Sequence, residues 1–476
     1  MKRLFLVVAA ALLLCTTAFA QHNLRTGYFL DGYTYKHKLN PAFGGDRGYF
    51  AIPVAGYVSA GVESNLALST LLYPTGDGTL TTFLSPSVKA EDFLSKIKDN
   101  NPFDMNADIG IVSLGFNAGK SYNTIDLSLK ADARMNVPGS LFSWAKKYGS
   151  HLDMTSLGLN ANARLELSYG YSRSIGEKVR VGAKVKLLAG LARAEYQMDK
   201  LTVDMEADKW RAEAQGTGYF ASPAMKLLTS DGVISGVEFA EVDEIQTILN
   251  SAMNAGNFGA ALDLGISVDV LKCLTVSASL TDIGFINWRG TSLGSDSDIW
   301  EYSGIDDIGA EGKDIGQQLE GLGNELLDII SPKVIADDVR FNDLLSMTAH
   351  VGVEFRMPFW QRLSVGALGT YRFDGPYSWW EARGSVNLAL ARWFSLTGNF
   401  AYSTFGDSFG AAINFHPNGI NLFIGVDSFK PALDVTPQFV PIHSFNTNLA
   451  VGLNLAFGKY HGRFPKKPKA APEADK

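Results

Sequence analysis

The chain has 476 residues, a net charge of -7 at pH 7 and 48 glycines. A mildly negative charge gives no reason to expect nucleic-acid binding. The length would suit two or three soluble domains, but no Pro- or Ser-rich linker divides the chain. One strand pattern runs from about Tyr49 to Phe457, which favours a single large closed sheet.

The first 20 residues have the pattern of a secretory signal peptide. Lys2 and Arg3 precede an apolar run, and Ala18-Phe19-Ala20 forms an A-x-A cleavage site. Without this signal, Cys273 is the sole cysteine, so we expect no intramolecular disulfide. No later stretch approaches the ~20 apolar residues that a membrane-spanning helix needs. The sequence therefore predicts an exported protein.

Residues 21–46 come before the first strand pattern and contain "LNPAFGG". They show no apolar surface of their own. We therefore expect them to fold back into the lumen of the closed sheet as a hatch.

The remaining sequence alternates large apolar residues with small or polar ones. In "NLAVGLNLAF" (448–457), one face carries the large apolar residues Leu449, Val451, Leu453, Leu455 and Phe457. The other face carries the alternate residues Asn448, Ala450, Gly452, Asn454 and Ala456. A lipid-facing outer surface and a polar lumen require this pattern in a transmembrane barrel. It recurs in fourteen predicted strands, at 49–62, 107–118, 124–136, 158–173, 179–194, 257–270, 274–288, 343–357, 362–374, 377–391, 394–404, 407–416, 420–430 and 445–457.

The predicted loops sort by side. Connections after even-numbered strands are all short, and the long ones (63–106, 137–157, 195–256, 289–342 and 431–444) all follow odd-numbered strands. Outer-membrane barrels have short periplasmic turns and longer extracellular loops. We therefore predict an all-β, antiparallel transmembrane barrel of about 14 strands over residues 47–457, in the bacterial outer membrane, with both termini in the periplasm. Aromatic residues at strand ends, among them Tyr49, Trp288, Trp379 and Trp380, fit two interfacial belts.

The lumen face of these strands carries mixed charge. The side chains expected to line it are Asp126, Lys130, Asp132, Arg134, Arg164, Glu166, Arg180, Lys184, Lys186, Asp263, Asp269, Glu381 and Arg383. Unpaired charges in a narrow lumen are costly, which favours a structural ionic network over a ligand path.

Two segments outside the strands are also distinctive. Residues 291–340 hold twelve acidic and three basic residues, but no twelve-residue calcium loop, which favours a solvated acidic loop over a calcium site. Apolar spacing predicts short helices in the extracellular loops, at 314–330 and 241–256. The tail 458–476 is rich in Lys and Pro, and we expect it to be disordered in the periplasm.

The sequence shows no clear motif for catalysis or for binding a cofactor or metal. His350, Glu354 and His416 are expected to point inward, yet the sequence places no nucleophile beside them. Metal-ligand spacings and phosphate-binding glycine loops are not found. We therefore expect no enzyme activity, cofactor or metal.

Asn40-Pro41-Ala42 resembles the NPA motif in the N-terminal hatch of the long-chain fatty-acid transporter barrels, which have fourteen strands and a plugged lumen. The runs "LGFNAGKSYNTIDLSLKADARMNVPGSLFSWAKKYG" and "LDLGISVDVLKCLTVSASLTDIGFINWRG" resemble more closely an uncharacterised family of Bacteroidota outer-membrane proteins. The first resemblance implies transport of a small or amphipathic solute, although a charged lumen departs from the greasy track of a hydrophobic conduit.

The alternative function is a non-transporting surface-binding role, or a role in outer-membrane secretion or assembly, with a surface protein as partner. In either case, the last strand, ending at Phe457, resembles the signal read by the barrel-insertion machinery. The other expected partner is outer-membrane lipid.

Overall fold

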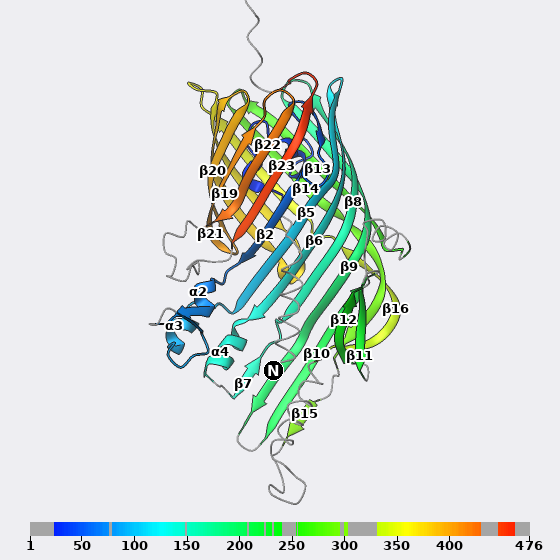
Figure 1. The fold of residues 1–476 in the computed structure, drawn as a ribbon, viewed down its shortest axis with the longest axis vertical. Helices are drawn as coiled ribbons and strands as arrows, with labels where there is room; N and C mark the ends of the chain where they lie inside the picture. Colours follow the sequence, from blue (N-terminus) through cyan, green and yellow to red (C-terminus); the bar gives the residue numbers. More distant parts are fainter. Residues whose placement is uncertain are drawn as a thin grey trace, which may run out of the picture.

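A computed structural model describes residues 23–75, 79–147, 150–206, 209–222, 225–230, 233–239, 254, 256–295, 299–302, 331–429 and 446–461. Antiparallel strands dominate these residues and form a tall barrel (Figure 1). The signal peptide expected at 1–20, most of the predicted tail and both predicted loop helices lie outside the described residues, except for isolated positions near 254–256.

The main sheet contains β1 (Gly48–Ala51), β2 (Val58–Ser64), β5 (Asn100–Ala118), β6 (Ser121–Pro138), β7 (His151–Asp153), β8 (Gly158–Ile175), β9 (Val179–Met205), β10 (Trp210–Ala221), β11 (Met225–Ser230), β12 (Val233–Phe239), β13 (Phe258–Leu271), β14 (Leu274–Gly294), β15 (Ile299–Tyr302), β16 (Lys333–Leu344), β17 (Thr348–Arg356), β18 (Leu363–Arg372), β19 (Trp379–Ala391), β20 (Phe394–Ser403), β21 (Gly406–Phe415), β22 (Ile420–Phe429) and β23 (Thr447–Phe457). A separate hairpin joins β3 (Leu72–Pro74) to β4 (Leu80–Thr82).

The barrel closes where the last strand meets the first. Gly48 of β1 pairs with Phe457 of β23, and Val58 of β2 pairs with Val451 of the same strand. On their other side, β1 and β2 both pair with β5. β1 and β2 are therefore one wall strand, interrupted at 52–57. β16 and β17 likewise pair in succession with β14 and make another. With β5, β6, β8, β9, β13, β14 and β18 to β23, the ring has fourteen strands, which confirms the predicted fold class.

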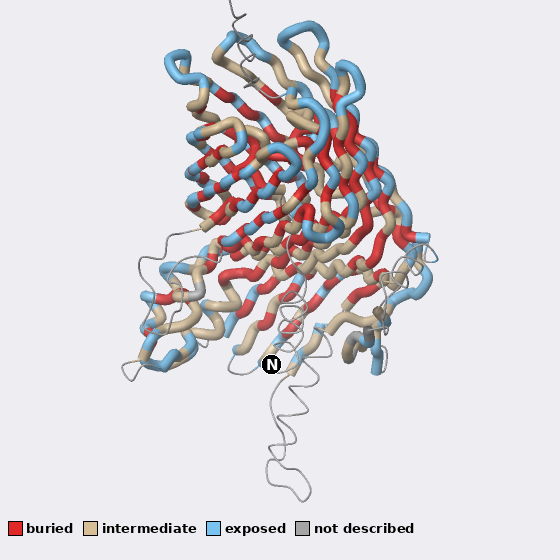
Figure 2. The backbone as a smooth tube through the Cα atoms, turned by 45° about the horizontal axis from the view of Figure 1, so that its top comes forward, coloured by how far each residue is buried: buried red, intermediate tan, exposed pale blue. Residues whose placement is uncertain are grey.

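Burial alternates along the wall, as the sequence pattern requires (Figure 2). In β23, Asn448 and Asn454 are fully buried, whereas Leu449 and Leu455 are 41% and 49% exposed. Val185, Leu187 and Val386 are similarly exposed on other strands. Apolar residues thus cover the outside and polar residues fill the inside, the arrangement of a barrel that spans a lipid bilayer.

The strands differ from the prediction at one end. The turns at 119–120, 176–178, 272–273 and 416–419 are short and lie together at what we call the short-turn end. At the opposite, long-loop end, the predicted loops contain further sheet: β9 continues to Met205, β10 pairs with it, and β16 begins at Lys333 rather than at 343.

The part of the sheet that extends beyond the predicted strands at the long-loop end, here called the extension, has a hydrophobic core of its own. Met198, Leu201 and Val203 of β9 pack with Ala212 and Ala214 of β10. Loop lengths alone could not reveal this core, because it depends on pairing between strands that the sequence analysis assigned to one loop.

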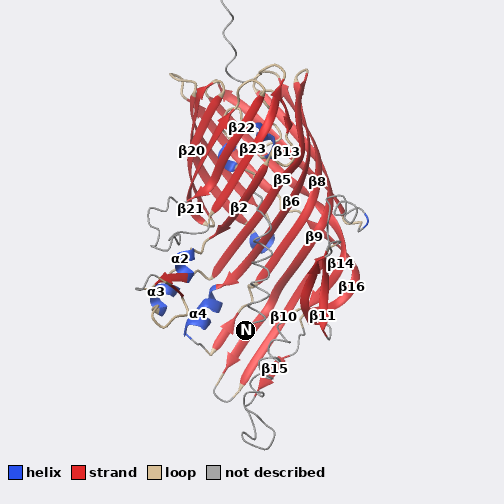
Figure 3. Cartoon of the chain, in the orientation of Figure 1, coloured by secondary structure: helices blue, strands red, loops and turns tan. Residues whose placement is uncertain are grey.

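Helices are few and short (Figure 3). They are α2 (Leu68–Leu71), α3 (Ala90–Leu94), α4 (Gly139–Lys147) and the 3-10 turns η1 (Arg25–Gly27), η2 (Thr34–Lys38) and η3 (Gly375–Tyr377). Leu141 and Trp144 of α4 pack on the core of the extension. Within the described residues, no helix is both long and apolar enough to cross a membrane.

A charge placed on the outer face tests the assignment of the two faces. Val386 lies in the middle of β19 and is 53% exposed. Val386→Arg is expected to lower the folded fraction in lipid vesicles, because an arginine facing lipid near the midplane costs ~2–4 kcal/mol. Val386→Leu is the control and should fold like the parent, measured by heat-modifiable gel mobility. Equal folding of both variants would contradict a lipid-facing wall.

Candidate functional site: the occupied lumen

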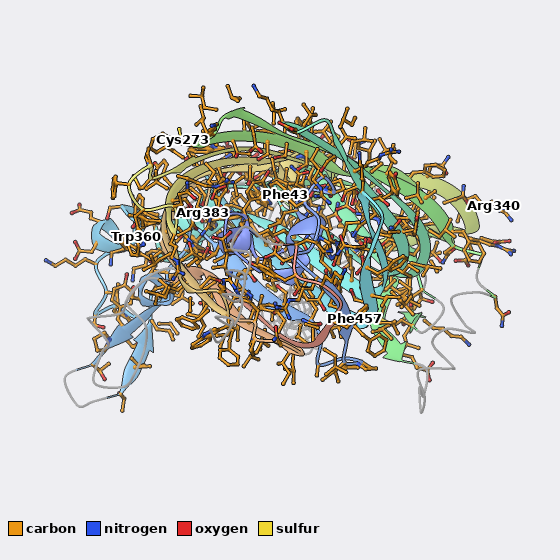
Figure 4. All side chains as sticks on the ribbon, turned by 90° about the horizontal axis from the view of Figure 1, so that it is seen from above. Phe43, Cys273, Arg340, Trp360, Arg383 and Phe457 are labelled. Atoms are coloured by element: carbon orange, nitrogen blue, oxygen red, sulfur yellow. The ribbon has the colours of Figure 1, made fainter. Side chains whose placement is uncertain are left out.

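Residues 23–47, here called the N-terminal segment, lie inside the barrel. Figure 4 looks along the barrel and shows this segment enclosed by the strands, with Phe43 inside and Cys273 and Trp360 at the periphery. Leu24, Leu30 and Tyr35 are at most 1% exposed. The segment therefore occupies the lumen as a small folded body.

Two apolar faces of the segment pack against two separate parts of the wall. On one side the rings of Tyr33 and Tyr35 pack against Phe423 of β22, at centroid distances of 5.0 and 5.7 Å. On the other side, Phe29 lies against Gly352 of β17 and Gly366 of β18. A Cβ at either glycine would collide with aromatic atoms of the segment, so these glycines make room for it.

The Asn40-Pro41-Ala42 motif is seated against β9 and β13. The Asn40 side-chain oxygen accepts a hydrogen bond from the Ala42 amide (2.9 Å), and its Nδ2 donates to the carbonyl of Ala278 (3.2 Å). Pro41 lies directly on Gly182, and Asn40 lies on Gly265. The motif thus forms a tight turn that two wall glycines allow to approach closely.

The segment brings its own cations to wall carboxylates. Arg25 pairs with Glu63 (2.7 Å), and its amide donates to Asp427 (2.9 Å). Lys38 pairs with Asp108 at 2.6 Å. The sequence analysis missed these five charged residues. The two cations lie outside any strand pattern, Glu63 lies just beyond the predicted strand 49–62, and Asp108 and Asp427 lie in predicted strands for which no lumen-facing charge was expected.

The predicted lumen charges on β6 and β9 join this network. Lys184 donates to Asp126 (3.0 Å) and lies 3.1 Å from Nδ1 of His37 in the segment. Lys130 pairs with Glu166 at 3.0 Å. These side chains are at least nine-tenths buried and hold a partner of opposite sign, as buried charges require.

A bulge adds a carboxylate that strict alternation would turn outward. Leu262 pairs with Ile283 but Leu264 pairs with Leu280, so Thr281 and Asp282 together oppose Asp263. Asp282 has φ 60° and receives Lys186 at 2.7 Å, while Asp263 receives the same Nζ at 2.8 Å. The bulge also reverses the faces of the rest of β14.

Because of this reversal, the predicted position of one residue of the aromatic belts is wrong. Trp288 is fully buried against Gly190 instead of lying at the membrane surface. Two further belt predictions are wrong: Trp379 is 3% exposed, with Arg25 5.0 Å from its ring centroid, and Tyr49 is buried beside His37. Each points into the lumen, where segment side chains occupy the space beside it. Trp380, at 43% exposed, faces outward.

Ion pairs also bridge the lumen nearer the long-loop end. β6 and β18 are the third and ninth strands of the ring and so lie nearly opposite each other. Arg134 of β6 binds Asp132 on its own strand and also Asp374, which follows β18. Arg193 of β9 reaches Asp343 of β16 at 2.8 Å. The sequence analysis missed Arg193 because a second bulge, between β8 and β9, turns it inward.

The turn after β18 reinforces this bridge. The Tyr377 hydroxyl donates to Gln197 of β9 (3.4 Å) and lies against Gly158 of β8. Partial burial of this loop residue raises the pKa of Tyr377 above its ordinary value. The turn 374–378 therefore contacts the wall on the far side of the lumen.

The other predicted lumen residues take varied positions. Glu381 and Arg383 form a two-pronged pair (2.8 and 3.0 Å) next to Thr26 of the segment. Arg164 donates to Asp132 (3.1 Å). Arg180 is half-buried, near Gly44 and Ser172. Asp269 is exposed near the short-turn end and accepts a bond from Thr275.

The candidate histidines have separate surroundings. Nδ1 of His350 lies 3.0 Å from the Thr370 hydroxyl, while Glu354 pairs with Arg356 (3.1 Å). His416 is in the turn after β21, and burial lowers its pKa to about 4. Much of the acidic stretch 291–340 lies outside the described residues; within its described part, Asp338 binds Arg289 and Asp337 binds Thr291.

A methyl group at Gly265 should loosen the N-terminal segment. Gly265→Ala would place a Cβ against Asn40, so we expect the NPA turn to move and the segment to become more accessible to protease from the short-turn end. Gly384→Ala is the matched control, because a Cβ there meets nothing within 4 Å. The measurement is the rate of cleavage within residues 23–47 in folded barrels. Identical rates for the two variants would show that the close approach is not needed.

The chain is similar to several solved structures and to one protein family. Solved structures with a similar fold include the toluene transporter TbuX of Ralstonia pickettii (10% identity, 93% of this chain and 97% of that one, TM-score 0.43). A FadL homologue of Pseudomonas aeruginosa is 11% identical over 92% of this chain and 98% of that one, with a TM-score of 0.40. No curated protein sequence matches. A family model matches residues 41–427, and the chain therefore belongs to the family of unknown function DUF5723.

Proposed function

We propose that this protein is an outer-membrane channel or transporter for a small solute, with its lumen closed in the present structure. The apolar outer wall fits the outer membrane as its location, and the polar lumen fits a water-soluble or amphipathic solute. The N-terminal segment is the proposed hatch.

One observation carries this proposal: the segment is held by side chains and not by the sheet. Its hydrogen bonds to the wall strands involve side chains, such as Ser279 to the Leu39 carbonyl (2.7 Å) and Asn421 to the Gly32 carbonyl (3.0 Å). A backbone bond joins its end, at the Asp46 carbonyl, to the His461 amide beyond β23 (2.7 Å). Separate side-chain contacts can exchange for water one by one. The segment could therefore move while all wall strands stay paired.

The ion pairs that bridge the lumen near the long-loop end are a second obstacle. They join side chains of β6 and β9 to Asp343 and Asp374, and they do not pass through the N-terminal segment. Removal of the segment alone would leave them in place. Passage of a solute therefore requires a change at both places.

Conductance of variants tests this arrangement. Deleting residues 23–46 should raise single-channel conductance in planar bilayers, and adding Asp374→Asn should raise it further, because that change weakens the contact with Arg134. Glu177→Gln, in the exposed turn after β8, is the neutralisation control and should have no effect. Conductance that stays at zero in every variant would count against a channel.

A surface-binding or assembly role is the second candidate, favoured by the sheet extension at the long-loop end. The extension has its own buried core, which a simple pore would not need. The predicted loop 289–342 includes most of β16, a wall strand, so its removal would disrupt the ring. Deleting only 303–330 spares the described strands.

Pull-downs from detergent-solubilised membranes should distinguish the two roles. An assembly component is expected to lose a co-purifying partner when 303–330 is deleted, with no conductance in any variant. A transporter is expected to keep its conductance after the same deletion. Both measurements should be made on one preparation.

A further inference from the structure

Three arginines gather in the lumen around a single carboxylate. Arg134 and Arg164 both bind Asp132, and Arg372 of β18 lies 4.0 Å from one of its oxygens. We call these three side chains the arginine cluster. Asp132 also accepts a bond from Asn162 (2.7 Å), so both of its oxygens are already engaged.

Arg372 is left with little compensation. Its side chain is 10% exposed, its ion pair with Asp132 is long (4.0 Å), and its buried Nε–H has no acceptor among the described residues. Of the neighbouring carboxylates, Asp374 binds Arg134 and Asp343 binds Arg193, while Asp104 of β5 shares this part of the lumen and accepts a hydrogen bond from Asn106 (2.8 Å). Burying a guanidinium without a close counter-charge is costly, so an arginine in this position indicates a missing anionic partner.

The unsatisfied donors point the same way. The Nε–H groups of Arg134, Arg164 and Arg372 are all buried, and no acceptor for them lies among the described residues. A guanidinium presents a planar fork of donors that matches the paired oxygens of a carboxylate or a phosphate. One oxyanion could accept from several of these groups at once.

The surroundings restrict the remainder of the ligand. Asn162 and Ser346 supply polar groups beside the cluster. The adjoining wall carries the Lys130–Glu166 pair instead of an apolar track. Trp288 packs over Gly190, the residue paired with Arg164, so the lining is mixed. Its several charged groups favour a compact, polar anion over a long hydrocarbon chain.

We propose that the arginine cluster recognises an oxyanionic group, a carboxylate or a phosphate, of the transported solute. This inference rests on the proposed function. The anion takes donors that now serve Asp132 and Asp374, so its arrival weakens the ion pairs that bridge β6 and the turn after β18. The arginines thus exchange a carboxylate partner for the anion, and the same exchange weakens the ion pair between Arg134 and Asp374.

Anion binding to the full chain tests the proposal directly. Isothermal titration of the detergent-solubilised protein with inorganic phosphate, and separately with acetate, is done at constant ionic strength against a chloride blank. At least one oxyanion should bind the wild type, and Arg372→Gln should weaken that binding at least about tenfold, because it removes a charged donor. Arg372→Lys keeps the charge but loses the fork, and should fall between the two.

The controls separate this site from general charge effects and from misfolding. Arg289→Gln removes an exposed arginine outside the lumen and should bind like the wild type. Heat-modifiable mobility confirms that each variant is folded, and Arg372→Lys serves as the test variant if Arg372→Gln does not fold. An affinity for phosphate and acetate no greater than for chloride, or unchanged by both Arg372 variants, overturns the proposal.

Conductance on the same preparations distinguishes this inference from the proposed function. If oxyanion binding depends on Arg372 in a protein that never conducts, the result supports the anion site and contradicts the proposed transport function. Conductance in a protein that binds neither oxyanion overturns the anion site and leaves transport standing.

Discussion

The pairing of buried charge is the constraint on which this barrel depends. A closed sheet turns every second side chain into the lumen, and here many of those side chains are ionised. Removing one member of a buried pair costs about 3–5 kcal/mol, because the other charge stays behind without a partner. The positions of Asp126, Lys184 and Glu166 are therefore coupled to one another across strands, and the wall cannot be understood one strand at a time.

The N-terminal segment belongs to the same system of charges. Glu63, Asp108 and Asp427 face the lumen from three strands, and Arg25 and Lys38 of the segment contribute cations to them. If the segment left, water would have to solvate these carboxylates. The segment thus supplies counter-charges to the wall and also fills the lumen. This dual role explains why aromatic packing around Tyr35 accompanies the ion pairs.

The fold could be predicted from the sequence because the bilayer imposes a strict period of two on each strand. The lumen was predicted only in part. Lys130 and Glu166 lie in regular strands and were found, whereas Asp282, Arg193 and Trp288 lie at or beyond bulges, where one extra residue reverses the faces. Arg25 and Lys38 belong to a segment without periodicity, so only the three-dimensional structure shows which strands they reach.

The two sets of contacts in the lumen differ in what they connect. The first joins the N-terminal segment to the wall, so its loss would affect the position of the segment and leave the pairing of the ring strands intact. The second joins one part of the ring to another, through Arg134 with Asp374 and Arg193 with Asp343. The first of these pairs depends on the distance between nearly opposite walls, and the second on the distance between strands three apart in the ring. A fourteen-stranded ring can alter both distances by flattening or rounding without breaking a backbone hydrogen bond. Arg372 lies between these walls with an incomplete set of partners. An anion bound at Arg372 would therefore act on the ion pair between Arg134 and Asp374 without contacting the N-terminal segment.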